Sequence, residues 1–364
     1  MADGRPPTLL RRGSILSEPL TIALDAMGGD DAPEIVLRGA DLARRRFPGV
    51  RFIVYGDNAL IMPLLERTAN LRDIVTVRHT DEVVTNEAKP SVALRQGRNS
   101  SMQLAINAVR GGEAEGVVSA GNTGALMAMA KVALKTLPGI DRPAIAAVFP
   151  TQRGECVMLD LGANVECDAD NLFQFGVMGS VFARTVLGLL KPSVGLLNVG
   201  IEEMKGNEAV RQAAACLRES RMPIQYHGFV EGDDIFKGTV DVIVTDGFTG
   251  NVALKTIEGT IRLYSDFLRK AFKSSLISRL GYLLARHSLN KLRARLDPRR
   301  YNGAMFLGLK GIVIKSHGGT DAFGFANAIG VAVDMSTNGF NDKIIKELAV
   351  HDPSDASAAR AAAS

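Results

Sequence analysis

Short runs of β-branched and other apolar residues recur along this chain, separated by longer segments whose apolar residues return every three or four positions. Runs of the first kind predict buried strands, and segments of the second kind predict helices with one apolar face. The expected strands are Thr21–Ala26, Arg51–Tyr55, Ile74–Val77, Gly116–Ser119, Ala144–Phe149, Cys156–Leu161, Val194–Val199, Val240–Thr245 and Ile312–Lys315. The clearest expected helices are Pro33–Phe47, Val92–Arg110, Thr123–Leu137 and Asn171–Leu190. This alternation predicts an α/β fold with a mainly parallel sheet covered by helices on both faces.

The composition agrees with a large packed body. Apolar residues make up 46% of the 364 residues, enough for one elaborated domain or two closely joined ones. The 37 glycines against 14 prolines indicate many tight turns between strands and helices. Three cysteines without close pairing do not make a disulfide framework, so we expect buried free thiols in a reducing compartment.

Both ends of the chain differ from the body. Residues 1–19 lack the continuous apolar core of a signal peptide and are expected to form a flexible extension. Residues 351–364 are rich in alanine and serine and are expected to form a disordered tail, which leaves residues 20–350 as the α/β domain. No run reaches the roughly 18 apolar residues of a membrane-spanning helix.

Six loops that follow expected strands combine glycine with small polar residues. They are 25–30, 119–124, 160–164, 198–200, 246–251 and 316–320. In parallel sheets, ligands bind beyond the carboxyl ends of the strands, so we expect these loops to converge on one crevice. Glycine lets main-chain N–H groups approach an anion, and a following helix adds partial positive charge, which favours a phosphate site. The alternative is that glycine ends strands and caps helices for backbone reasons alone.

Several other site types have no motif in the chain. There is no G-x-x-x-x-G-K-[ST] loop and no G-x-G-x-x-G after the first strand, so neither a nucleoside triphosphate nor a dinucleotide is predicted. The G-x-S-x-G nucleophile motif is also missing, and the five histidines do not show H-E-x-x-H spacing. We therefore expect neither an acyl-serine intermediate nor a metal site.

The same loops carry a specific resemblance. The segments 25–30, 119–125, 160–164, 198–206, 246–255 and 314–318 resemble, in order, the motifs of the acyl-ACP:phosphate acyltransferase family of bacterial phospholipid synthesis. The likeness covers roughly Leu20 to Glu347. It implies a three-layer αβα fold related to phosphotransacetylases and to isocitrate and isopropylmalate dehydrogenases.

The resemblance also implies an activity and partners. Family members move a long-chain fatty acyl group from acyl carrier protein to inorganic phosphate, and the acyl phosphate feeds a membrane acyltransferase that acylates glycerol 3-phosphate. We accordingly expect a homodimer in the cytoplasm, in transient contact with the inner face of the cell membrane and with that acyltransferase. No cofactor is expected beyond the two substrates, phosphate and the phosphopantetheine arm of the carrier protein.

Three residues are candidates for catalysis. Phosphate is already partly dianionic near neutral pH, so its attack on a thioester depends mainly on alignment and on stabilising the developing oxyanion. Lys205 can neutralise negative charge, Asn251 can donate an N–H, and His317 can protonate the departing sulfur. The alternatives are a solvated surface lysine, a helix N-cap and a structural histidine.

The substrate-binding candidates all lie in the glycine loops. Neutral donors at a helix start suit phosphate or pantetheine, although capping explains them equally well, and the first two aspartates are expected to orient other groups because they would repel phosphate. The set is Asp25, Gly28, Gly29, Asp30, Ser119, Asn122, Thr123, Gly124, Asp160, Asn164, Asn198, Asp246, Thr249, Gly250 and Ser316.

Positive charge is concentrated in one segment. Residues 262–300 carry eleven Lys/Arg against two acids, a net charge of +9 in a chain whose total is +4. Apolar residues recur there at helical spacing, so about 255–300 is expected to form a protruding helical arm, with Ser274 and Ser275 at a turn. The arm can pack on the body or on a second subunit, dip into anionic lipid, or dock the acidic carrier protein. The candidates for carrier-protein or membrane contact are Lys273, Arg279, Leu280, Leu283, Arg286, Lys291, Arg293 and Arg295.

Other functions remain open at this level. A short-chain phosphotransacetylase that uses coenzyme A, a non-catalytic membrane-surface scaffold and a dehydrogenase of the related fold are the alternatives. Nucleic acid is not expected as a partner, because no recognition motif or aromatic interleaving accompanies the basic segment.

Overall fold

The computed structural model describes residues 19–220, 222, 224–295 and 297–349. The extension and the tail expected at the two ends therefore lie almost entirely outside the described residues. The strands are β1 Leu20–Asp25, β2 Val50–Gly56, β3 Val75–His79, β4 Gly116–Ser119, β5 Ala144–Pro150, β6 Glu155–Leu159, β7 Ser193–Leu197, β8 Gln225–Val230, β9 Val242–Val244, β10 Ala304–Leu307 and β11 Ile312–Lys315.

The helices alternate with these strands along most of the chain. They are α1 Glu34–Arg46, α2 Asn58–Glu66, α3 Pro90–Gln96, α4 Ser101–Arg110, α5 Thr123–Leu134, α6 Ala169–Val186, α7 Glu208–Glu219, α8 Asp234–Lys237, α9 Gly247–Lys273, α10 Leu276–Arg295, α11 Ala322–Thr337 and α12 Phe340–Leu348, with the 3-10 turns η2 Ala69–Leu71 and η3 Pro298–Tyr301. The mixed α/β class with a mainly parallel sheet is thereby confirmed.

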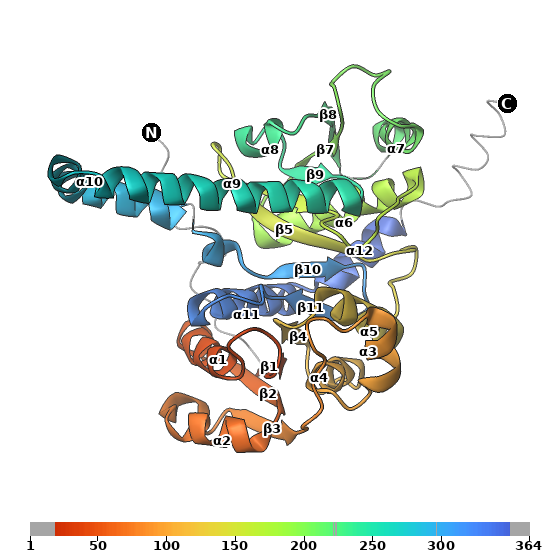
Figure 1. Ribbon diagram of the computed structural model, residues 1–364. Coiled ribbons are helices and arrows are strands. Elements are labelled where there is room, and N and C mark those ends of the chain that lie inside the picture. Colours follow the sequence, from red (N-terminus) through yellow and green to blue (C-terminus); the bar gives the residue numbers. More distant parts are fainter. Residues whose placement is uncertain (1–18, 221, 223, 296, 350–364) are drawn as a thin grey trace.

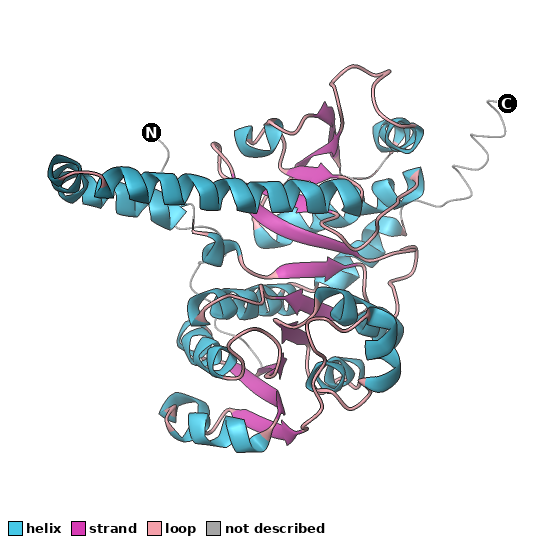
Figure 2. Cartoon of the chain, in the orientation of Figure 1, coloured by secondary structure: helices cyan, strands magenta, loops and turns pink. Residues whose placement is uncertain are grey.

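All the described strands form one sheet with helices on both faces (Figure 2). The reason is visible in β1, where Ile22 and Leu24 point into one hydrophobic cluster and Ala23 into the other. The first cluster packs against α1, α6 and α11, and the second against α4 and α5. Because successive side chains of a strand point to opposite faces, a continuous apolar run requires this three-layer arrangement.

The strands fall into two blocks that run in opposite directions. The order across the sheet is β3-β2-β1-β4-β11-β10-β5-β6-β9-β7-β8. Pairing is parallel from β3 to β11 and again from β6 to β8, while β10 pairs antiparallel with β11 and β5, and β5 pairs antiparallel with β6. The carboxyl ends of the two parallel blocks therefore do not face the same way.

The helical arm is present, and its helices span 247–295 where about 255–300 was expected. Helix α9 begins at Gly247, crosses one face of the molecule, and projects beyond the body before the chain returns along α10 (Figure 1). The chain turns at Ser274 and Ser275, as the sequence predicts. Phe272 and Tyr282 pack edge to face across this hairpin, with ring centroids 5.4 Å apart. No helix in the described part of the chain combines the length and apolar character needed to cross a bilayer.

Candidate active site

Three glycine loops of the first block meet at the ends of β1, β4 and β11. Asp25 ends β1, and its buried carboxylate accepts hydrogen bonds of 2.6 Å from the hydroxyls of Ser101 and Ser119. The amide of Asp30 donates to the carbonyl of Gly318 at 3.0 Å. These contacts hold the loops 25–30, 119–124 and 316–320 together.

Glycine is required where these loops cross. A Cβ added to Gly28 would lie 2.6 Å from the amide nitrogen of Gly121 and 2.6 Å from the Asp25 carboxylate. Gly29 has a φ of 106°, a conformation that other residues rarely adopt. In the described chain, no acceptor is recorded for the amide N–H groups of Gly28, Gly29 and Gly318. Closely spaced N–H groups without partners suit an anion.

Two further loops meet in the second block. Asp160 follows β6 and accepts from the amides of Ile145 at 2.9 Å and Ala163 at 3.0 Å, and from both the amide and the side chain of Asn164 at 2.7 and 2.9 Å. Burial raises the pKa of Asp160, while these N–H donors favour the ionised form. Asp160 and Asn164 thus fix the shape of their loop.

Helix α9 starts against this loop. Asp246 caps it, accepting from the amide and the hydroxyl of Thr249 at 2.8 Å each. A Cβ added to Gly250 would lie 1.8 Å from the carbonyl oxygen of Asp160, so only glycine fits. The side chain of Asn251 lies over Gly162, about 3.4 Å from the position a Cβ would take there. Asn251 therefore faces the Asp160 loop.

Helix α9 also carries charge toward the first cluster of loops. Burial lowers the pKa of His317, Lys315, Lys255 and Arg262 add to that effect, and Glu258 opposes it. Lys255 lies one helical turn beyond Asn251. The expectation of one crevice at one edge of the sheet is therefore only partly met: two clusters form because the strand blocks are opposed, and α9 runs from one cluster to the other.

Several predicted ligand donors are engaged inside the protein instead. The Ser119 hydroxyl donates to Asp25 and accepts from the Gly121 amide, and the Ser316 hydroxyl accepts from Asn302 at 2.8 Å. The Asn122 amide group caps α5 and donates to the carbonyls of Asn86 and Ala88 at 2.8 and 3.0 Å. Ser119 and Asn122 thus have protein partners in this structure, and Asn122 fits the capping alternative, whereas Thr123 is exposed at the start of α5.

The loop that carries Lys205 lies apart from the first cluster. Asn198 donates its side-chain N–H to the carbonyl of Lys205 at 3.1 Å, which closes the loop after β7. The Lys205 side chain is exposed, and within the described residues no hydrogen bond or ion pair is recorded for its ammonium group. The structure thus leaves Lys205 available but does not bring it to His317.

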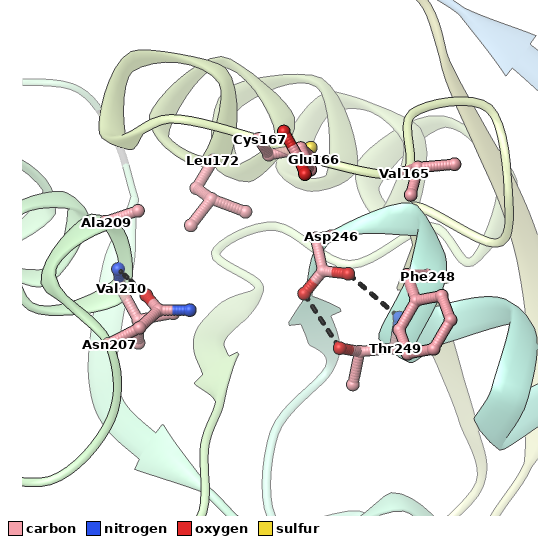
Figure 3. Close-up of a pocket in the computed structure, with 10 residues that line it drawn as sticks. All are labelled: Val165, Glu166, Cys167, Leu172, Asn207, Ala209, Val210, Asp246, Phe248 and Thr249. Carbon is pink, nitrogen blue, oxygen red and sulfur yellow. Dashed lines mark hydrogen bonds between the residues drawn. The ribbon is translucent and has the colours of Figure 1, made fainter.

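A pocket of about 370 Å³ opens beside the start of α9. Figure 3 shows Asp246 and Thr249 on one side, Leu172 and Cys167 above them, and Asn207 across from them. Its lining is Val165, Glu166, Cys167, Leu172, Asn207, Ala209, Val210, Asp246, Phe248 and Thr249. Burial raises the pKa of Cys167 to about 12, so this thiol is not a ready nucleophile. The pocket offers partly apolar walls next to the Asp160 loop.

Sequence reasoning missed Lys315, the last residue of β11. Its partly buried ammonium group donates to the carbonyl of Ala120 at 3.2 Å and to that of Ser316. A lysine that ends an otherwise apolar run, directly before a glycine loop, is the signal that was available. In the described residues, no group of three His, Cys, Asp or Glu side chains is placed to hold a metal ion.

Comparisons with known proteins agree over nearly the whole chain. A family model described as "Fatty acid synthesis protein" matches residues 20–343. The phosphate acyltransferase of Rhodospirillum centenum is 67% identical over 92% of this chain and 94% of its own length. That of Paramagnetospirillum magneticum is 62% identical over 96% of this chain and 99% of its own length.

Solved structures show the fold at much lower identity. A phosphotransacetylase from Streptococcus pyogenes superposes with a TM-score of 0.61 at 17% identity, covering 91% of this chain and 97% of that one. A 4-hydroxythreonine-4-phosphate dehydrogenase from Klebsiella pneumoniae superposes with a TM-score of 0.50 at 14% identity, covering 88% of this chain and 100% of that one. The expected relation to phosphotransacetylase-like and dehydrogenase-like folds is confirmed.

Proposed function

This chain belongs to the fatty acid synthesis protein family, and from that premise we propose that it is a phosphate acyltransferase that moves a long-chain fatty acyl group from acyl carrier protein to inorganic phosphate. The observation that carries the proposal is identity of 62–67% to phosphate acyltransferases over more than nine tenths of the chain. The acyl phosphate would serve the acylation of glycerol 3-phosphate in phospholipid synthesis. No cofactor takes part in this reaction.

Phosphate binds at the first cluster of loops. The amides of Gly28, Gly29 and Gly318 supply N–H groups there, and Lys315 and Lys255 supply positive charge. An oxygen of the hydrogen phosphate dianion forms the new C–O bond, and the C–S bond of the thioester breaks. The proton that the phosphate loses is taken up by the departing thiolate, so the reaction needs no net acid or base.

His317 stabilises the departing thiolate. Its Nδ1 accepts from the amide of Gly319 at 3.1 Å, which selects the tautomer with hydrogen on Nε2. The lowered pKa of His317 keeps the ring neutral near pH 7. In that tautomer the ring donates an Nε2–H hydrogen bond to the departing thiolate, while the proton itself passes from the phosphate to the sulfur. Asn251 and Lys205 act on the side of the second cluster, where the thioester oxygen gains charge.

The acyl thioester enters along the second cluster. The pocket beside α9 has apolar walls from Leu172, Val210 and Phe248 for the part of the chain next to the reacting carbonyl. The basic arm begins on α9 and continues along α10, and its positive charge suits the acidic surface of the carrier protein. Arg293 stacks on Tyr282 within the hairpin, whereas Arg295 donates to the carbonyl of Thr151 between β5 and β6 and ties the arm to the body.

Helix α9 further supports a homodimer and membrane contact. Only Gly247 and Gly250 of its residues are buried, although Leu263, Tyr264 and Phe267 are apolar. A second copy of the chain would cover this apolar face of α9. If analytical ultracentrifugation at micromolar concentration finds only monomer, the proposed homodimer is contradicted. We place the protein in the cytoplasm, with the exposed tip of the arm at the inner face of the cell membrane.

One assay tests the main proposal. Purified protein receives long-chain acyl-ACP with and without phosphate, and free thiol is followed together with acyl phosphate trapped by hydroxylamine. Thiol release that depends on phosphate and matches the trapped acyl group is expected. Activity with acetyl-coenzyme A but not with acyl-ACP would favour a short-chain phosphotransacetylase. Thiol release without phosphate would indicate a thioesterase, and the absence of any turnover would favour a non-catalytic scaffold.

A further inference from the structure

Lys315 lies at the junction of the three loops that receive phosphate. It ends β11 in parallel register with Ser119, the last residue of β4. Its ammonium group donates to Ala120 in the loop after β4 and to Ser316 in the loop after β11. One side chain therefore ties two of the loops together through their carbonyl oxygens.

Asp25 supplies the third loop and the opposite charge. Its carboxylate is buried, ends β1, and is held by the hydroxyls of Ser101 and Ser119. The Asp25 carboxylate is an electrostatic partner of Lys315, as is the Asp30 carboxylate at the rim of the same loop. Two carboxylates beside an anion site would repel a phosphate dianion unless a cation offsets them.

The charged groups that act on Lys315 come from β1, the loop before α1, α9 and the loop after β11 itself. Asp25 belongs to β1, Asp30 to the loop before α1, and Lys255 to α9, and His317 follows two residues later. Burial lowers the pKa of Lys315 to about 8, Lys255 adds to this effect, and the two carboxylates oppose it. The ammonium form is therefore dominant at pH 7 and is lost above about pH 8.

We infer that Lys315 is a positioning residue for phosphate: its ammonium group fixes the three glycine loops in the arrangement that presents their N–H groups, and it offsets Asp25 and Asp30. This inference rests on the proposed function. Lys315 acts through the loops, since its recorded hydrogen bonds go to carbonyl oxygens. The inference assigns Lys315 to phosphate binding rather than to the departure of the thiol.

The matched variants are Lys315→Met, Lys315→Arg and Lys310→Met. Lys310 is an exposed lysine on the same β-hairpin and serves as the control. We expect Lys315→Met to raise the KM for phosphate by about 10- to 100-fold, the loss typical of removing the hydrogen bonds of a charged group, here those that hold the loops, with a much smaller change in kcat. Lys310→Met should leave both constants unchanged.

The pH profile separates this role from general stabilisation. In the wild type, the KM for phosphate should rise as the pH passes about 8, because the ammonium form is lost. Lys315→Arg keeps its charge and should move that rise to higher pH, and Lys315→Met should lose the dependence. Circular dichroism and thermal melting establish that each variant is folded, and if Lys315→Met does not fold, the shift in Lys315→Arg alone decides the matter.

These experiments distinguish failure of the Lys315 role from failure of the proposed function. If the wild type forms acyl phosphate while the phosphate KM and its pH dependence are the same in all three variants, the role of Lys315 is refuted and the proposed function stands. If the wild type forms no acyl phosphate from any acyl-ACP, the proposed function itself fails. Direct titration with phosphate alone then still reports whether Lys315→Met weakens anion binding.

Discussion

Contacts at single glycines decide whether the site can form. Gly250 lies where the first turn of α9 meets the Asp160 carbonyl, and its missing side chain lets helix and loop touch. Because the backbone approaches this closely, Asn251 on the next position is held over Gly162. The position of a catalytic candidate thus depends on a neighbour that has no side chain at all.

Gly250→Ala is expected to destabilise the protein by at least about 2 kcal/mol and to abolish acyl transfer, because a Cβ would overlap the Asp160 carbonyl. Gly259→Ala on the same helix is the control, since a Cβ there meets nothing within 4 Å. Gly259→Ala should increase the free energy of unfolding by about 0.5–1 kcal/mol, because alanine has a higher helix propensity than glycine. Urea unfolding measures both, and equal effects of the two changes would contradict this account.

Asp334 on α11 predicts a pH dependence of stability. Burial raises the pKa of Asp334 to about 6, and Arg46 opposes the shift. The folded form then binds the proton more tightly than the unfolded chain, so this group's stabilisation is full at acidic pH and is lost as pH rises from about 4 through 6. Asp334→Asn should remove that loss, about 1–3 kcal/mol by pH 8. If the free energy of unfolding changes equally between pH 5 and pH 8 in the wild type and in Asp334→Asn, this role of Asp334 is refuted.

At the scale of elements, α9 and α10 carry more exposed large apolar side chains than any other pair of helices among the described residues. Leu276, Ile277 and Leu284 at the tip are 80% or more exposed, among the basic residues Lys273, Arg279 and Arg286 that the sequence singled out. Of the two leucines predicted to touch lipid, Leu280 is 59% and Leu283 61% exposed. An apolar tip with a basic border suits a surface of anionic lipid.

Leu280→Glu should lower binding to vesicles that contain anionic lipid by about tenfold, because it removes apolar contact and adds repulsion. Turnover of soluble acyl-ACP should stay unchanged. Leu60→Glu on α2 is the control, since Leu60 is 48% exposed on another helix. Co-sedimentation measures the binding, and unchanged partitioning of Leu280→Glu would reject the tip as the lipid contact.

At the scale of the whole molecule, periodicity was sufficient for the layers but not for the strand directions. Each of the nine expected strands coincides with a strand of the structure, but β8 and β10 were missed. In β8, Gln225 and His227 interrupt the apolar pattern, and β10 is short, spanning only Ala304–Leu307. The expected helix Val92–Arg110 divides into α3 and α4, because Gly97 ends the first and Ser100 caps the second. The connection between β5 and β6 is too short for a parallel crossover, so that reversal was readable from the sequence.

The site was predictable as a set of loops but not as a set of donors. Glycine next to small polar residues marks a loop that needs close approach, and five of the six predicted loops meet in two clusters. Which polar atoms remain for a ligand depends on distant partners, such as the carbonyls of Asn86 and Ala88 that accept from Asn122. Lys315 was missed for the same reason, because its partner Ala120 is far away in sequence.

Helix α9 connects the candidate active site to the exposed tip of the arm. One straight rod of 27 residues, about 40 Å long, holds Asn251 near its beginning and the hairpin turn at its end. A surface that binds the hairpin turn therefore also sets the orientation of Asn251 and of the site around it. If the tip of the arm rests on a membrane, the direction of α9 fixes the side of the molecule on which the product leaves.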